Sequence, residues 1–218
     1  MNIRIEWTYL HPKKTESTLF SSEWMTIEAA MAIANDLEKL GRIKSLTFFD
    51  EHDSTWTMKE LKRYLQSLED EPHELIAYFD GGFDIQEKTA GLGAVIYYKQ
   101  SGKRYRLRHN RKIDLIGSNN EAEYAALMLV LEQIEQLNVT HQSVKIYGDS
   151  LVVINQMNDE WPCYEEDLLA WIGRIEQKAK ELGLTLIFES ISRKDNREAD
   201  QLASQALQGV EIDSKLEI

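Results

Sequence analysis

The chain has 218 residues, 43% of them hydrophobic and 28% charged, a composition typical of a water-soluble globular protein with one large or two small domains. Its formal net charge of −12 argues against a general nucleic-acid-binding protein, because affinity for phosphate comes from clustered Lys and Arg. The sequence has no run of about eighteen apolar residues and no N-terminal signal pattern, so we expect neither membrane insertion nor secretion. Cys163 is the only cysteine, which excludes an internal disulfide and fits a cytoplasmic protein.

Residues 1–70 are predicted to form a small α+β domain. Alternating apolar and polar residues predict strands at 2–9 and 18–25, and helical spacing predicts a helix that Gly41 ends. Strands at 45–49 and near Trp56 follow. Thr57 and Glu60 form a capping box that predicts the start of a last helix. Acidic residues outnumber basic ones here, and no residue pattern carries recognisable chemistry. The role of this domain is therefore open.

The acidic, proline-containing stretch 69–74 marks a domain boundary. The elements predicted after it are strands at 75–80, 91–98 and 105–112, a helix from Ser118 to Leu137, a strand at 144–147, helices from Leu151 and at 168–182, a strand at 184–190 and a helix at 197–208. Three strands followed by α-β-α-α-β-α predict an α/β fold with a mixed five-stranded sheet flanked by helices over residues 75–208. Residues 209–218 are polar, and we expect a frayed tail.

Residues 99–112 form a basic segment within this acidic protein. They include seven Lys and Arg side chains and no acid, namely Lys99, Lys103, Arg104, Arg106, Arg108, Arg111 and Lys112. Two interpretations stay open. The segment is either a solvated hairpin or the place where a phosphate backbone lies.

Four acidic residues recur in distinctive settings. Asp80 and Asp149 each end an apolar strand, Glu123 lies inside a largely apolar helix, and Asp200 lies near the start of the last helix. Carboxylates gathered at the rim of a sheet repel one another, and a divalent cation such as Mg²⁺ removes that repulsion. Read singly, Asp149 also fits a helix cap and Asp200 a solvated helix residue, so spacing alone leaves metal binding as one hypothesis.

Five linked segments resemble the ribonuclease H family, type 1, in particular the bacterial and archaeal branch with a C-terminal Arg-x-x-Asn-x-x-Ala-Asp motif. The resemblance covers about residues 75–208. The segments, in the family's order, are Asp80-Gly81-Gly82, Gly91-Leu92-Gly93-Ala94-Val95, Ser118-Asn119-Asn120-Glu121-Ala122-Glu123-Tyr124, Gly148-Asp149-Ser150, and Asn196-Arg197-Glu198-Ala199-Asp200-Gln201-Leu202-Ala203.

The resemblance implies endonucleolytic hydrolysis of the RNA strand of RNA–DNA hybrids with two Mg²⁺ or Mn²⁺ ions. It places Asp80 between the two ions, Asp200 on the ion that activates the attacking water, and Glu123 with Asp149 on the ion that faces the leaving oxygen. It also implies that Gly81, Asn119 and Asn120 contact the substrate, where the 2′-hydroxyls distinguish RNA from DNA.

The chain departs from the family pattern in three places. No histidine follows His141, whereas many relatives carry a mobile histidine before the final Asp. Either proton handling or product release is slower here, or Arg193 or Lys194 assists. The stretch 159–167 is acidic where some members carry a basic protrusion, and residues 1–70 do not resemble the family's known hybrid-binding module. Two alternatives follow: a catalytically weak or inactive nucleic-acid-binding protein, and an interaction protein whose first domain binds a protein partner. A proofreading exonuclease is disfavoured, because Gly82 stands where that chemistry needs an acid.

Overall fold

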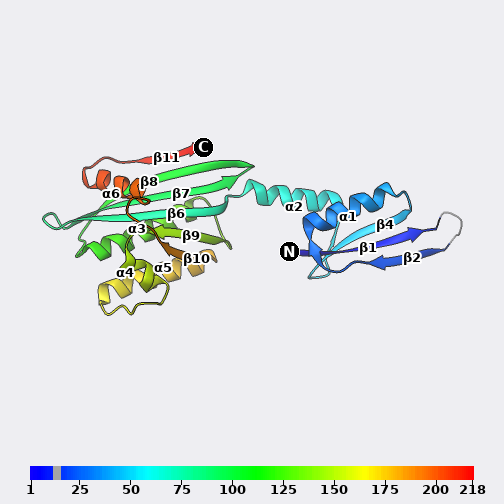
Figure 1. The fold of residues 1–218 in the computed structure, drawn as a ribbon, viewed down its shortest axis with the longest axis horizontal. Helices are drawn as coiled ribbons and strands as arrows, with labels where there is room; N and C mark the ends of the chain where they lie inside the picture. The colour runs from blue at the N-terminus through cyan, green and yellow to red at the C-terminus, as the bar shows by residue number, and fades with distance from the viewer. Residues whose placement is uncertain (12–15) are drawn as a thin grey trace. The chain divides into compact units, whose positions relative to one another are not determined.

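The computed structural model describes residues 1–11 and 16–218, which form two compact units, Met1–Leu68 and Glu69–Ile218 (Figure 1). Among these described residues, no helix is both long enough and apolar enough to cross a membrane.

The first unit is a sheet covered by helices around a small core. Its strands are β1 (Asn2–Leu10), β2 (Ser17–Ser21), β3 (Met25–Thr26), β4 (Ile43–Asp50) and β5 (Thr55–Trp56), and its helices are α1 (Ile27–Lys39) and α2 (Met58–Asp70). The sheet order is β2-β1-β4-β5, with β3 also paired to β1. Thr57 and Glu60 form the expected capping box, since each accepts the backbone N–H of the other, at 3.2 and 2.8 Å. The small N-terminal α+β fold is confirmed.

The second unit contains a six-stranded mixed sheet in the order β10-β9-β6-β7-β8-β11. The strands are β6 (His73–Asp84), β7 (Thr89–Gln100), β8 (Lys103–Asp114), β9 (Ser143–Gly148), β10 (Thr185–Ser190) and β11 (Asp213–Glu217). Strands β6, β7 and β8 form an antiparallel meander, while β9 runs parallel to both β6 and β10. The helices are α3 (Asn119–Gln136), α4 (Leu151–Met157), α5 (Glu166–Leu182) and α6 (Arg197–Leu207). This is the predicted α/β architecture, with one strand more than expected.

The additional strand corrects our expectation of a frayed tail at residues 209–218. Residues 213–217 pair antiparallel with β8. The anchor is Asn110 of β8, which is only 5% exposed. Its Nδ2 donates to the carbonyls of Leu202 and Val210, at 3.0 and 2.9 Å, and its Oδ1 accepts from the N–H of Ile212 at 2.7 Å. A short polar edge strand has no hydrophobic periodicity, so the sequence pattern did not reveal it.

Small residues let two helices approach opposite faces of the sheet. A Cβ on Gly81 of β6 would lie 2.3 Å from the backbone of Ala122 in α3. A Cβ on Gly91 of β7 would lie 2.1 Å from the carbonyl oxygen of Ala203 in α6. Gly91 pairs with Gly82, so these two residues point to the same face of the sheet. Gly81, the neighbour of Gly82 on the strand, points to the opposite face. Helices α3 and α6 therefore enclose the end of β6 that carries Asp80.

Candidate active site

The four acidic residues line one cavity of about 340 Å³ in the second unit. They come from four separate elements: β6, α3, the end of β9 and α6. The other lining residues are Gly81, Gly82, Asn119, Ser150, Arg193 and Ser204.

Asp80 reaches the cavity from β6 and is buried, with 8% exposure. Its strand partner is Gly93, which has no side chain to cover the carboxylate. Burial raises the pKa of Asp80 to about 7, and the nearby negative charges of Asp149 and Asp200 add to this.

Glu123 enters from α3 and is 7% exposed. The N-cap Ser118 starts this helix by accepting the N–H of Glu121 at 3.1 Å, which places Glu123 early in the second turn. Its Oε2 accepts the backbone N–H of Gly81 at 3.2 Å. Burial raises the pKa of Glu123 to about 9, with further contributions from the charges of Asp80 and Asp149.

Asp149 directly follows the last residue of β9. The residue before it is glycine because a Cβ on Gly148 would lie 2.6 Å from the ring of Phe79. Ser150, not Asp149, is the N-cap of α4, since its side chain accepts from the N–H of Val153 at 3.5 Å. The alternative that Asp149 is only a helix cap is therefore wrong. Its Oδ1 instead accepts a hydrogen bond of 2.7 Å from Nδ2 of Asn196.

Asp200 lies in the first turn of α6 and forms an ion pair at the cavity wall. Arg193 donates to its Oδ1 from Nη2 at 2.7 Å and from Nε at 3.2 Å. Asp200 is thus not a simple solvated helix residue. Arg193, one of the two alternatives for the absent histidine, lines the cavity, whereas Lys194 does not.

Two of the three residues expected to contact substrate line the cavity. Gly81 and the exposed Asn119 line the cavity, and Asn120 does not. Sequence reasoning assigned no role to Ser204 or to Asn196, which is 1% exposed and bonded to the cavity acid Asp149. The one sequence feature that could have indicated a role for Asn196 is its place in the C-terminal motif, directly before α6.

The donor set fits a hard divalent cation. Among residues 1–11 and 16–218, no three His, Cys, Asp or Glu side chains converge as a ready-made metal-binding group. The cavity nevertheless presents carboxylate oxygens, which Mg²⁺ and Mn²⁺ prefer. Four carboxylates and one cation, Arg193, line the cavity, which leaves an excess of acidic groups for a divalent cation to bind.

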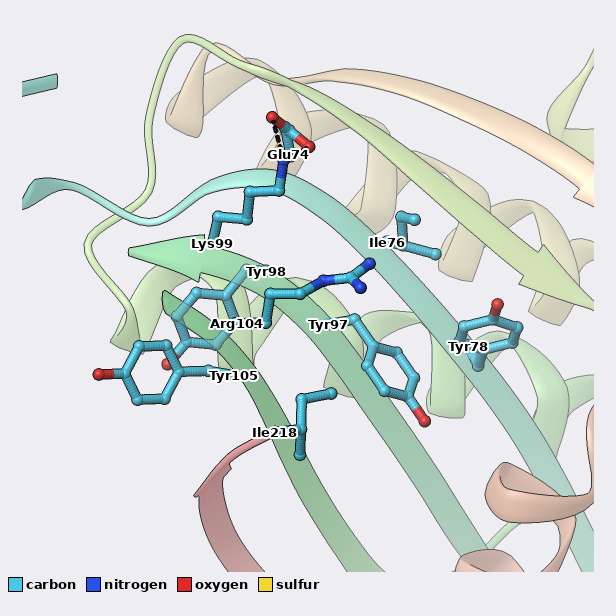
Figure 2. Close-up of a pocket in the computed structure, with 9 residues that line it drawn as sticks. All are labelled: Glu74, Ile76, Tyr78, Tyr97, Tyr98, Lys99, Arg104, Tyr105 and Ile218. Carbon is cyan, nitrogen blue, oxygen red and sulfur yellow. Dashed lines mark hydrogen bonds and ion pairs between the residues drawn. The ribbon is translucent and has the colours of Figure 1, made fainter. Parts of the chain in front are cut away.

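Another cavity, of about 260 Å³, lies elsewhere on the same sheet and contains none of the four acids. Figure 2 shows the Arg104 side chain between Tyr98 and Tyr97, with Tyr78 beyond Tyr97, and the bond between Glu74 and Lys99. Its tyrosine and aliphatic lining offers no cluster of carboxylates, so we do not place the chemistry there.

The basic segment around β8 is largely neutralised by neighbouring acids. The ion pairs are Lys99–Glu74, Lys103–Glu217, Arg106–Glu198, Arg108–Glu198, Arg111–Glu132 and Lys112–Glu87. Of the seven cations only Arg104 has no ion pair within the described part of the chain. The segment as a whole is thus not a free phosphate-binding strip.

Comparison with known proteins agrees with this fold. Residues 78–206 match the reverse transcriptase-like family, and the chain belongs to that family. The uncharacterized protein YpeP of Bacillus subtilis (strain 168) is 44% identical over 202 residues, which cover 92% of this chain and 89% of YpeP. An alignment of that length includes most of the first unit as well as the second.

Solved type 1 ribonucleases H share the fold of the second unit. LC11-RNase H1 in complex with an RNA/DNA hybrid has a TM-score of 0.56 and 28% identity, covering 62% of this chain and 98% of its own. RNase H1 from the archaeon Halobacterium salinarum NRC-1 has a TM-score of 0.53 and 25% identity, with the same coverage. The N-terminal RNase H domain of rv2228c from Mycobacterium tuberculosis has a TM-score of 0.54 and 26% identity, covering 62% of this chain and 94% of its own. The ribonuclease H resemblance is confirmed.

Proposed function

We propose that this protein is a metal-dependent endoribonuclease that hydrolyses the RNA strand of RNA–DNA hybrids. The observation that carries the proposal is the single cavity lined by Asp80, Glu123, Asp149 and Asp200. Fold alone does not define an activity, but these acids coincide with the family's motif positions. The similar LC11 structure, which was solved with a hybrid, supports the choice of substrate.

The four acids would hold two Mg²⁺ or Mn²⁺ ions. Such ions supply an activated water and stabilise the leaving oxygen of a phosphodiester. The protein's own part is to hold the carboxylates in place: the Gly81 N–H fixes Glu123 and the Asn196 amide fixes Asp149. Asp80 and Glu123, with pKa values of about 7 and 9, must also release their protons for cations to bind.

Asn119 supplies a polar side chain at the cavity wall for recognition of RNA. It is exposed at the start of α3, four residues before Glu123, so substrate at the acids also meets its amide. Asn120, the next residue of the helix, would contact the same RNA strand, and so would Gly81, which lines the cavity beside the acids. An amide can bond to the 2′-hydroxyl, which distinguishes RNA from DNA.

The test is cleavage of a labelled RNA–DNA hybrid with Mg²⁺ and with Mn²⁺. We expect cuts only in the RNA strand, and at least about a hundredfold loss of rate in Asp149→Asn, as is usual when a principal electrostatic group is removed. The matched control is Asp159→Asn, which removes the same charge from an exposed residue outside the cavity. Intact RNA with both metals between about pH 6 and 9 would reject the proposal.

One observation favours a second candidate, a catalytically weak nucleic-acid-binding protein. Arg193 occupies the carboxylate of Asp200, where the proposed mechanism needs a metal ligand. This candidate predicts salt-dependent binding of the hybrid without turnover. It is distinguished from the first by the cleavage assay with Mn²⁺.

A further inference from the structure

A second groove lies beside the acidic cavity, along α6. It has a volume of about 700 Å³ and is lined by Arg108 of β8 and by Arg197, Glu198, Asp200, Gln201 and Ser204 of α6. Asp200 and Ser204 also line the acidic cavity, so the two depressions are adjacent. A polymer bound at the four acids can extend into this groove without leaving the surface.

The polar residues of α6 in this groove are not needed for packing. Arg197, Gln201 and Ser204 recur at i, i+4 and i+7, so they share one face of the helix, and all three are exposed. The opposite face carries the buried Ala199, Leu202, Ala203 and Ala206, against the sheet. The exposed face thus presents a row of hydrogen-bond donors roughly 10 Å long, about the axial length of three nucleotides of one strand.

Arg197 is not explained by the stability of the helix. It occupies the first position of α6, where a cation opposes the helix dipole. It forms no ion pair within residues 1–11 and 16–218. The two acids of the groove already have partners: Glu198 accepts from Arg106 at 3.1 Å and from the hydroxyl of Tyr97 at 2.8 Å, and Asp200 accepts from Arg193 at 2.7 Å. The guanidinium of Arg197 is therefore available to an external anion.

Arg108 is held only loosely on the other side of the groove. Its Nη1 lies 3.8 Å from Glu198, and its Nε donates to the hydroxyl of Ser214 at 3.4 Å. Most other cations of the β8 segment are in ion pairs of 2.7 to 3.1 Å. In a protein of net charge −12, two available guanidinium groups next to the acidic cavity form a local site for phosphate.

We propose that Arg108, Arg197, Gln201 and Ser204 form a phosphate-binding track for the RNA strand next to its cleavage site. This inference rests on the proposed function, because the strand in the track is the one that reaches the four acids. It supplies a place for basic contacts that the acidic stretch 159–167 cannot provide. An acidic protein segment is the competing occupant, and it would leave hybrid binding unaffected by changes in the track.

The experiment measures hybrid affinity as a function of salt in an Asp149→Asn background, which keeps the substrate intact. Each lost phosphate contact lowers the slope of log K against log salt by about 0.9. We expect Arg197→Ala to lower the slope by that amount and to weaken binding about fivefold to tenfold, with no loss of Tm. With Asp149 restored, Arg197→Ala should raise KM far more than it changes kcat, because the contact is made before and during cleavage.

The matched control is Lys180→Ala, which removes an exposed cation from α5, a helix that packs against α3. This control should keep the slope and the affinity. An unchanged slope in both Arg197→Ala and Arg108→Gln, in a protein that cleaves hybrids, overturns the track and leaves the proposed function intact. A protein that binds hybrids without cleaving them refutes the proposed function, while the slope still tests the track. Absence of any hybrid binding at low salt rejects both.

Discussion

Asn196 donates a hydrogen bond of 2.7 Å from its Nδ2 to Oδ1 of Asp149, and the same nitrogen donates to the carbonyl of Phe79 at 2.9 Å. Phe79 precedes Asp80 on β6, Asp149 follows β9, and Asn196 precedes the helix that carries Asp200. One buried amide therefore connects the elements that position three of the four acids. Its two bonds join residues 47 and 117 positions apart in the sequence.

We expect Asn196→Ala to lower both stability and RNA cleavage. The buried carbonyl of Phe79 loses a donor, which costs about 1–3 kcal/mol, and Asp149 loses its fixed orientation. Urea unfolding measures the first effect and the hybrid assay the second, where we expect a loss of more than about tenfold. Asn158→Ala is the control, since its amide also bonds a backbone carbonyl, that of Phe188 at 3.3 Å, outside the cavity. Equal losses of cleavage in the two variants would contradict this role.

The role of Asn196 could not be predicted from the sequence, whereas the settings of Asp80 and Asp149 could. The contexts of Asp80 and Asp149 were readable because each ends an apolar strand, a local pattern. The function of Asn196 depends on two partners brought near only by the folded sheet, so its sequence position indicated no more than a helix start. The ion pairs of the β8 cations could not be predicted from sequence for the same reason. Glu198 pairs with Arg106 and Glu217 pairs with Lys103, and both acids lie in elements far along the chain. Strand β11 was not predicted because the side chain that anchors it, Asn110, lies in β8, about 100 residues earlier in the sequence.

Gly81 tests the close approach of α3 to β6. A Cβ there would lie 2.3–2.4 Å from backbone atoms of Ala122 and Glu123, which cannot rotate away. We expect Gly81→Ala to shift α3, to break the bond from Gly81 N–H to Glu123, and to destabilise the protein by at least about 1–3 kcal/mol. Cleavage should fall with stability, as measured by thermal unfolding and the hybrid assay.

The control for Gly81 is Gly173→Ala, on α5. A Cβ at Gly173 meets nothing within 4 Å, and alanine in a helix is more favourable than glycine by roughly 1 kcal/mol. This variant should have unchanged or increased stability and full activity. A Gly81→Ala protein as stable as Gly173→Ala would show that the helix and strand are less closely packed than described.

The raised pKa values predict that the metal-free protein loses stability as pH rises. In the unfolded chain Asp and Glu titrate near 4, whereas in the folded protein Asp80 titrates at about 7 and Glu123 at about 9. The folded state thus holds protons that the unfolded state has released. The contribution of these two groups to the free energy of unfolding is therefore greatest below about pH 4. As pH rises, the contribution of Asp80 is lost up to about pH 7 and that of Glu123 up to about pH 9. Urea unfolding across this range, with chelator present, measures the decline.

Added Mg²⁺ or Mn²⁺ should reverse that decline, because cations favour the ionised carboxylates. We expect the increase in Tm on adding either metal to be larger at pH 8 than at pH 5. The double variant Asp80→Asn with Glu123→Gln should show a flatter pH profile and a smaller metal effect. A metal-induced increase in Tm that is equal at both pH values, or equal in the double variant, would contradict the assignment of these two groups as ligands.

Removal of residues 210–218 tests the anchoring of β11. The truncated chain leaves Asn110 without the carbonyl of Val210 and the N–H of Ile212, in a position that is 5% exposed. Unsatisfied buried groups cost about 1–3 kcal/mol each, so we expect the free energy of unfolding to fall by at least about 2 kcal/mol. Asn110→Leu should destabilise the chain of residues 1–218 but recover part of the loss in the truncated one, because an apolar side chain needs no partner at the vacated positions of Val210 and Ile212. Additive effects in this double-mutant cycle, measured by urea unfolding, would mean that β11 is held by its strand pairing alone and not by Asn110.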